Sequence, residues 1–393
     1  MKKIRRILVL LLVAVGVSSA AAQEVVPLVK EDVSPEVKAD SVVKKESFFK
    51  RLGRYLTSTD EADSRAISKF SIIGGPHYDT EKKFGLGLVG TSQFRLSGCD
   101  ELMQPSNVSM SVDVSFRGFV SVGVKGNIFF PDDSKRLLVD ADFKYSPTYY
   151  WGMGYDNGDN DTNETKMKKT STMLRADFMW RLAPHLYLGP MLEWQSAHTQ
   201  PLERPELLEG QRMTVYNIGV GFTLDYDTRN YVTAPTRGVY LHYSQLFNPK
   251  FCNKYYYTMT DLRACGYIGA WRGGVIAGEV QAQFNFGKPS WAAMAQLGSS
   301  NSMRGYYPGR YRDKHMVTAQ VELRQTIYGP VGAVVWGGAG TVFHNSDTFC
   351  NKVLPNFGIG LRWSFRPHVN IRLDYGFGKS RQNGFMFAIN EAF

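Results

Sequence analysis

Long uninterrupted apolar segments are scarce in this 393-residue sequence. Its mean hydropathy is −0.26, and 21% of its residues are charged. A bundle of membrane-spanning helices needs several apolar segments of about 20 residues each. These values therefore exclude a helical membrane bundle. Intrinsic disorder is excluded as well, because aromatic residues make up 13% of the chain, which is too many for a disordered protein.

Signals of catalysis and of metal binding are also scarce. The sequence has four Cys and seven His, and its histidines have no metal-ligand spacing. It contains no H-E-x-x-H, Walker or G-x-S-x-G motif. Residues 85–90 fit G-x-G-x-x-G but lie inside a predicted strand, and Glu164 takes the glycine position of a calcium-like loop that begins at Asp159. We therefore expect no enzymatic activity, no metal site and no cofactor.

The positive charge is partly that of a targeting peptide. The formal charge is +10, from 46 Lys+Arg and 36 Asp+Glu. Residues 1–22 have four basic residues, then an apolar segment at 7–17, then Ala20-Ala21-Ala22, which is typical of a cleaved secretory signal. Its removal leaves 42 basic and 36 acidic residues, a charge of +6. This modest excess does not indicate a nucleic-acid partner.

Residues 23–69 are polar and mixed in charge, and we expect them to form a periplasmic tail. Within them, Phe48, Phe49, Leu52, Tyr55 and Leu56 follow helical spacing. One interpretation is a short amphipathic helix that lies on a membrane or plugs a pore. The other is a short helix that packs on the main domain.

From residue 70 to residue 393 the dominant period is two. In 356–366, for example, Phe357, Ile359, Leu361, Trp363 and Phe365 alternate with Asn, Gly, Arg and Ser. Such alternation predicts strands with one apolar face and one polar or glycine face. The predicted strands cover residues 70–78, 84–97, 107–117, 119–130, 136–146, 166–182, 186–198, 213–227, 238–248, 255–271, 274–286, 314–328, 331–344, 354–366, 368–378 and 383–393.

The length and number of these strands distinguish a membrane barrel from a soluble sandwich. Many are 10 to 14 residues long, whereas soluble strands average about 5–6. Short connections such as 131–135 alternate with long ones such as 150–164 and 199–212. We therefore predict an all-β fold: one transmembrane antiparallel β-barrel of about 16 strands, spanning 70–393, in the outer membrane of a Gram-negative cell. Lipid would contact its apolar faces.

The end of the chain carries a pattern of apolar residues. Phe385, Phe387, Ile389 and Phe393 share one phase, which we assign to the lipid-facing side. The pattern resembles the C-terminal signal that outer-membrane barrels present to their assembly machinery. That resemblance implies the assembly machinery as a partner during insertion.

Four segments, taken in order, resemble the BamA/TamA-type bacterial surface antigen family of outer-membrane assembly barrels. They are D-Y-D-T-R with P-T-R-G (225–229, 235–238), M-R-G-Y leading into V-E-L-R (303–306, 321–324), A-G-T-V (339–342), and G-I-G-L-R with R-L-D-Y (358–362, 372–375). The resemblance covers roughly residues 70 to 393.

The resemblance implies that a long external loop, here about 287–313, folds back into the barrel. Its motif is Met303, Arg304, Gly305 and Tyr306, and Arg304 is expected to pair with acidic residues on the barrel wall. Glu322 is the first candidate. The family usually has an Asp on the next strand, where this sequence has Gly338. Asp261 or Glu279 is then expected to take its place.

The resemblance also suggests a function. Relatives have periplasmic polypeptide-transport-associated domains of roughly 75 residues each, whereas residues 23–69 are too few and have no βαβ pattern. We therefore expect a member without such domains that acts in outer-membrane protein or lipid biogenesis or translocation, with a separate periplasmic scaffold protein. Lateral opening would occur between the first and last strands, where Gly74, Gly75 and Pro76 could weaken the seam. The alternative is a passive small-solute pore or surface antigen that keeps only the fold.

Two cysteines are candidates for a disulfide. Cys252 and Cys350 both fall in predicted external loops of an oxidising compartment. Cys99 is assigned to a periplasmic turn and Cys265 to a lumen face, and we expect both thiols to be unpaired.

Overall fold

The computed structural model describes residues 68–79, 82–99, 106–349, 352–366, 369–379 and 382–393. The predicted signal peptide (1–22), nearly all of the tail (23–69) and Cys350 lie outside these described residues.

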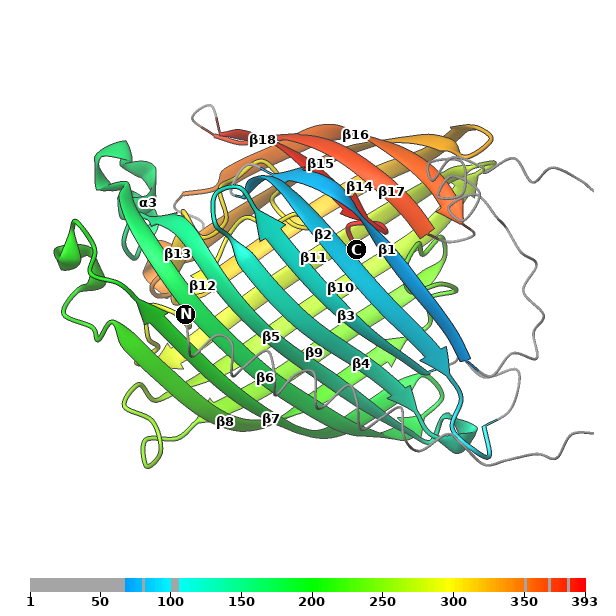
Figure 1. Ribbon diagram of the computed structural model, residues 1–393, viewed down its shortest axis with the longest axis horizontal. Helices are drawn as coiled ribbons and strands as arrows, with labels where there is room; N and C mark the ends of the chain where they lie inside the picture. The colour runs from blue at the N-terminus through cyan, green and yellow to red at the C-terminus, as the bar shows by residue number, and fades with distance from the viewer. Residues whose placement is uncertain (1–67, 80–81, 100–105, 350–351, 367–368, 380–381) are drawn as a thin grey trace, which may run out of the picture. The chain divides into compact units, whose positions relative to one another are not determined.

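One antiparallel sheet of sixteen strands forms most of the described part of the protein (Figure 1). Its strands, in hydrogen-bonded order, are β1 (Ser68–Asp79), β2 (Lys83–Phe94), β3 (Ser106–Ser115), β4 (Val120–Phe129), β5 (Lys135–Tyr150), β6 (Thr165–Ala183), β7 (Leu186–Thr199), β8 (Thr214–Asp227), β9 (Gly238–Asn248), β10 (Tyr257–Trp271), β11 (Gly274–Gly287), β14 (His315–Tyr328), β15 (Val331–Phe343), β16 (Leu354–Arg366), β17 (Val369–Phe377) and β18 (Asn383–Ile389). Each strand pairs with the next one along the chain, apart from a two-stranded hairpin between β11 and β14. The predicted fold class and strand number are confirmed.

The burial pattern along the strands is the reverse of that in a soluble protein. In β16, the apolar side chains of Phe357, Ile359 and Leu361 are 56–61% exposed, whereas Asn356 and Arg362 are 2% and 6% exposed. Side chains of successive residues point to opposite faces of a strand. The sheet therefore has an apolar outer face suited to lipid and a polar inner face, which we call the lumen wall.

The connections between strands differ at the two ends of the sheet. At one end the shortest connections include those between β6 and β7, β10 and β11, and β14 and β15. At the other end the longest connections contain the helix α3 (Tyr155–Asp159), the 3-10 turns η2 (Asp161–Asn163), η3 (Pro205–Leu208) and η4 (Ser346–Thr348), and the hairpin of β12 (Ala295–Gln296) and β13 (Arg312–Asp313). Short periplasmic turns and long external loops are typical of outer-membrane barrels, so we call the long-loop end external. Within the described part of the chain, no helix is long and apolar enough to cross a membrane.

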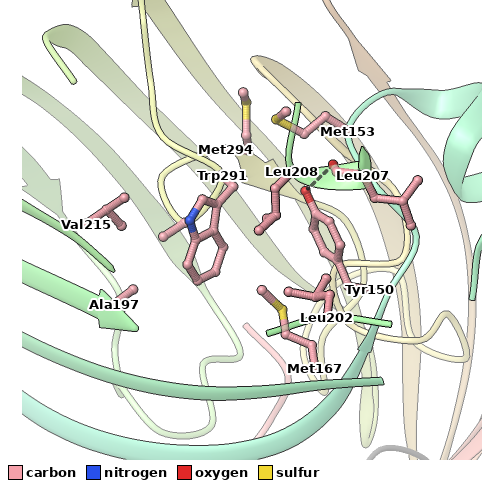
Figure 2. Close-up of a cluster of buried hydrophobic side chains, with 11 residues drawn as sticks. Tyr150, Met153, Met167, Ala197, Leu202, Leu207, Leu208, Val215, Trp291 and Met294 are labelled. Carbon is pink, nitrogen blue, oxygen red and sulfur yellow. Dashed lines mark hydrogen bonds between the residues drawn. The ribbon is translucent and has the colours of Figure 1, made fainter. Parts of the chain in front are cut away.

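The external loops have a hydrophobic core of their own. Tyr150, Leu207, Leu208 and Trp291 belong to a buried cluster that joins three loops (Figure 2). The Trp291 indole Nε1 donates to the main-chain oxygen of Arg212 at 3.0 Å, and the Tyr150 hydroxyl donates to that of Leu207 at 3.4 Å. The loops thus pack on one another above the lumen.

The first and last strands differ in length, and their edges are not joined. β1 has twelve residues and β18 has seven. The two strands lie beside each other, but no hydrogen-bonded ladder links them among the described residues. The seam of the barrel is therefore open along its backbone edges.

The last four residues, 390–393, correct one prediction. Asn390 has a φ of +69°, a left-handed conformation that ends β18 and turns the chain inward. Phe393 is then 6% exposed and packs with Cys265, Tyr267 and Ala277 on the lumen wall. The predicted strand 383–393 ends at Ile389, and the lipid-facing position assigned to Phe393 is wrong. Alternation was extrapolated through a residue that reverses the chain direction. We call residues 390–393 the C-terminal strap.

Candidate functional site: an arginine clamp in the lumen

The loop between β11 and β14 enters the barrel. This segment, residues 288–314, is called the lumen loop below. Its two arms pair at the β12–β13 hairpin, where Ala295 faces Asp313. Beyond the hairpin, the amide of Gly309 donates to the main-chain oxygen of Leu297 at 3.0 Å. The tip beyond this bond carries the predicted motif, and Arg304 there is fully buried.

The Arg304 guanidinium lies between two carboxylates from different strands. Its NH1 group donates to Asp374 on β17 at 2.8 Å, and its NH2 group donates to Glu322 on β14. The plane of the guanidinium lies over the Trp336 ring of β15, with 3.6 Å from Cζ to the ring centroid. A buried guanidinium requires both charge neutralisation and several acceptors, and this arrangement supplies them. We call Arg304, Glu322 and Asp374 the arginine clamp.

Glycines let the loop tip approach the wall closely. Gly305 has a φ of +104°, and a Cβ there would lie 2.6 Å from the main-chain carbon of Gly376 on β17. A Cβ on Gly376 would lie 2.3 Å from the Arg304 carbonyl oxygen. The side-chain amide of Asn356 on β16 donates to that same carbonyl. The tip therefore contacts β14, β15, β16 and β17, the four strands that precede β18.

The remaining motif residues anchor the tip in other ways. The Tyr306 hydroxyl donates to the main-chain oxygen of Pro355 at 2.6 Å and accepts from the amide of Lys379 at 2.8 Å. A Cβ on Gly378 would lie 2.6 Å from the Tyr306 ring, so the ring also needs a glycine beside it. Met303 is 1% exposed and packs with Leu297 and Leu354.

Two further arginines connect the clamp to the C-terminal strap. Arg324 donates to Glu322 at 2.9 Å and to the main-chain oxygen of Phe393 at 3.0 Å. Arg362 donates to Asp374 at 2.6 Å and to Glu391 of the strap at 2.8 Å. Arg372 also donates to Asp374, at 3.2 Å. The clamp carboxylates are thus shared between the lumen loop and the chain end, so one ion network joins two structures beside the seam.

The structure brings together some of the predicted site residues and separates others. Arg304 and Glu322 are in contact. Asp261 and Glu279 do not contact Arg304, so the substitution expected from the sequence is wrong. Glu279 accepts instead from Arg263, at 2.6 Å, and from the Gln320 amide. The second carboxylate of the clamp is Asp374. It takes the place of the acid that the family has on β15, where this chain has Gly338, and it lies on β17, two strands farther round the sheet.

Asp374 belongs to the R-L-D-Y segment of the sequence, but sequence reasoning did not pair it with Arg304. The available signal was its phase: Asp374 lies on the lumen face of a strand, two residues after Arg372. Sequence alone could not measure the distance across β15 and β16.

The structure also places other predicted residues. Phe385 is 37% exposed on the outer face of β18, and Phe387 and Ile389 share its phase. Cys252 lies in the external loop after β9 and has a free thiol in this structure. Cys350 lies outside the described residues, so their pairing stays a prediction.

A second set of contacts holds the lumen loop at its external end. Asp159 of α3 accepts from the Tyr311 hydroxyl at 3.0 Å and from the Lys379 ammonium at 2.8 Å. Burial acts to raise the pKa of Asp159, but the hydrogen bonds from Lys379 and Tyr311 outweigh it, so the pKa lies below its usual value. Arg310 donates to the main-chain oxygen of Gly158 at 2.8 Å and to Asp161 at 2.6 Å. The same loop is therefore held at its tip and at its base.

The clamp is suited to holding structure in place rather than to acid-base chemistry. Both carboxylates are fully buried, and each accepts hydrogen bonds from at least two arginines. Buried pairs of this kind are costly to break, because removal of one partner leaves the other charged and desolvated.

The fold resembles solved outer-membrane proteins. BamA from Haemophilus ducreyi, in a crystal structure lacking POTRA domains 1–3, aligns over 82% of this chain and 70% of its own, with a TM-score of 0.55 and 14% identity. CdiB from Acinetobacter baumannii aligns over 83% of this chain with a TM-score of 0.53 and 10% identity. CdiB from Escherichia coli aligns over 84% with a TM-score of 0.54 and 12% identity. The chain spans 60% and 64% of these two CdiB chains.

The family comparison covers most of the barrel. The Omp85 superfamily domain matches residues 91–393, which include the lumen loop, the clamp and the C-terminal strap. No curated protein sequence matches the chain. The apolar outer face and the family together place the protein in the outer membrane of a Gram-negative cell. By its sequence over these 303 residues, the chain belongs to the Omp85 superfamily.

Proposed function

We propose that this protein is a non-enzymatic barrel for outer-membrane biogenesis or translocation, which works by opening the seam between β1 and β18. The observation that carries the proposal is the position of the arginine clamp. It fixes the lumen loop to the four strands beside β18, while the edges of β1 and β18 are not joined by a ladder.

The physical basis is the chemistry of strand edges. An unpaired edge presents a row of N–H and C=O groups that can pair with another extended chain. In a bilayer such groups must be satisfied, so an open seam favours the addition of a strand from a client protein. The clamp would keep the β14–β17 wall rigid while β1 and β18 separate. The likeness to the folds of BamA and CdiB supports the barrel fold on which the proposal rests.

The test is a covalent lock on the seam. The four natural cysteines are first replaced by Ser, and single cysteines are then introduced in pairs, one in β1 and one in β18. We expect oxidised pairs to stop the insertion of newly made outer-membrane proteins or lipids in cells that depend on this barrel, and reduction to restore it. A cysteine pair across the laddered β4–β5 boundary is the matched control. Full activity with the seam locked would overturn the proposal.

A passive small-solute pore is the second candidate. It is favoured by the lumen wall of β3, where the polar side chains of Ser109, Ser111 and Asp113 remain partly exposed. Planar-bilayer conductance separates the two functions. The assembly proposal predicts a small conductance that increases in Arg304→Ala, because the lumen loop is then released. A large, steady conductance that Arg304→Ala leaves unchanged would favour the pore.

We further propose that a separate periplasmic scaffold protein works with the barrel. Capture of the tagged protein from native membranes after chemical crosslinking tests this proposal. We expect a periplasmic protein in stoichiometric amount, and recovery of the barrel with lipid alone would contradict the proposal.

The role of Phe385, Phe387, Ile389 and Phe393 as an assembly signal is likewise a proposal. Substitution of Phe385 by Ser should slow membrane insertion of the new chain.

A further inference from the structure

A pair of lysines at the external edge of the barrel faces one aromatic ring. The ammonium groups of Lys250 and Lys288 lie 5.7 Å and 5.9 Å from the ring centroid of Tyr256. The two ammonium groups are therefore at most 11.6 Å apart, the sum of these distances. Both lysine side chains are exposed, and within the described ranges neither forms an ion pair with a carboxylate. Two like charges have been brought together without an anion between them.

The local sequence contains no acid that could neutralise the pair. Segments 249–256 and 286–294 contain no Asp or Glu. Lys254 lies in the same loop, 5.9 Å from the centroid of the Tyr255 ring. The Tyr255 hydroxyl in turn accepts from the amide of Arg212, whose side chain is exposed. The charged side chains of segments 249–256 and 286–294 are therefore all positive.

The backbone places the lysine pair directly above the membrane surface. The Lys288 amide donates to the Tyr256 carbonyl at 2.9 Å, so these two residues stand side by side at the ends of β11 and β10. Two residues toward the membrane, Thr258 lies in register with both Phe247 and Phe286. These two Phe side chains are 43% and 57% exposed on the lipid-facing side. Aromatic residues at this position mark the border between acyl chains and headgroups.

A third aromatic side chain completes the arrangement. Phe251, next to Lys250, is 90% exposed, the largest exposed fraction among the large hydrophobic side chains of the described residues. In water such exposure has no benefit, whereas at a bilayer border the ring enters the acyl region. Cations above a row of lipid-facing aromatic rings match a molecule with a phosphate headgroup and acyl chains.

From this juxtaposition we infer that Lys250, Tyr256 and Lys288 bind the phosphate of an outer-leaflet glycolipid, with Phe251, Phe247 and Phe286 against its acyl chains. The inference rests on the outer-membrane location and does not depend on the proposed function. Charge complementarity selects the occupant, because a phosphate supplies the anion that the two ammonium groups lack. The site would anchor the external loops after β9 and β11 to the membrane surface.

The experiment measures binding of a bisphosphorylated, hexa-acylated glycolipid to the full chain in detergent micelles. With about 1 kcal/mol for each lysine near an anionic surface, we expect Lys250→Gln/Lys288→Gln to weaken binding roughly 30-fold. Lys250→Arg/Lys288→Arg should bind within about threefold of the wild type, because it keeps both charges. Retention of the heat-modifiable, folded form on gels verifies that the Gln variant is intact.

The matched control is Lys166→Gln/Lys168→Gln. These two lysines are also exposed, at the external end of β6, but Glu164 precedes them in the chain. The control should change affinity less than threefold. An equal loss in both double variants would overturn the site, because binding would then follow total charge. Equal binding of the dephosphorylated glycolipid would overturn it too, as would displacement of the lipid by equimolar inorganic phosphate.

Discussion

The two sides of the lumen wall differ in how they are occupied. On β14, the inward side chains of Thr318, Gln320 and Glu322 are at most 4% exposed, because the lumen loop covers them. On β3, the inward side chains of Ser109 and Ser111 are partly exposed. The lumen loop is thus fixed to the C-terminal wall and leaves the inner face of β3 partly accessible from within the barrel.

The side-chain chemistry explains the difference. The C-terminal wall has long charged residues, among them Arg324, Arg362 and Arg372, that lie along the wall and share carboxylates. The wall of β3 and β4 has mostly Ser, Gly and Asn, whose contacts are local, such as the bond between Asn127 and Asn107 at 3.2 Å. The proposed opening would separate these two walls where they meet, at the seam between β1 and β18.

The largest effect is expected from the clamp itself. Arg304→Ala leaves Glu322 and Asp374 buried without their shared partner, which should lower the free energy of unfolding by about 3 kcal/mol. Urea unfolding in detergent measures this. Lys125→Ala is the control on the opposite wall. Its ion pair with Asp140 at 3.0 Å leaves the lysine side chain 69% exposed, so a change within about 1 kcal/mol is expected. Equal losses would remove the contrast between the two walls.

Glycine substitutions should give the next largest effect. In Gly376→Ala the new Cβ would lie 2.3 Å from the Arg304 carbonyl oxygen, so the loop tip must move, at a cost of about 2 kcal/mol. The control is Gly337→Ala on β15, where a Cβ meets nothing within 4 Å on the outer face. Protease cleavage of the lumen loop in intact cells reports the displacement. We expect cleavage in the first variant only, and a protected loop in both would show that the tip tolerates the methyl group.

Strand periodicity was sufficient to predict the strands, because lipid and lumen each restrict the residue types on one face of the sheet. Residues 238–248 and 354–366 were predicted with the bounds that the structure has, since lipid requires apolar residues on one face and the lumen requires polar residues on the other. The same reasoning identified Glu322, which has a lumen phase and follows the loop motif. Residues of β5 beyond position 146 were missed, because outside the membrane the apolar requirement ends.

The missed features involve direction or distance across the sheet. The inward turn at Asn390 depends on one left-handed residue, which alternation does not encode. The pairing of Arg304 with Asp374 depends on the curvature that brings β17 to the loop tip. The short β12–β13 hairpin has too few residues to show a period. Sequence therefore predicted the wall well and predicted what fills the lumen only where a family motif existed.

A smaller effect should follow from the C-terminal strap. Glu391→Gln weakens the bond from Arg362, 2.8 Å long in the wild type, and the longer contact with Arg324 at 3.7 Å. Loss of a charged hydrogen bond should cost about 1.5 kcal/mol. Hydrogen exchange should then increase in β18 more than in β4, because the strap is continuous with β18. An equal increase in both strands would mean that the strap has no specific link to the seam.

The smallest effect is a pH dependence at the external base of the lumen loop. The pKa of Asp159 is held below its usual value, so its contribution to stability is complete above about pH 4 and is lost as the pH falls through the lowered pKa. Its side chain is 31% exposed, and exposed pairs contribute little, so only local loosening is expected. Hydrogen exchange of residues 151–164 should increase between pH 6 and pH 3 in the wild type. In Asp159→Asn this region should exchange faster at pH 6 and show a smaller increase on acidification, once intrinsic rates are corrected. Identical pH responses in the two proteins would show that Asp159 does not hold the external base of the lumen loop. The arginine clamp would then be the principal anchor of the loop.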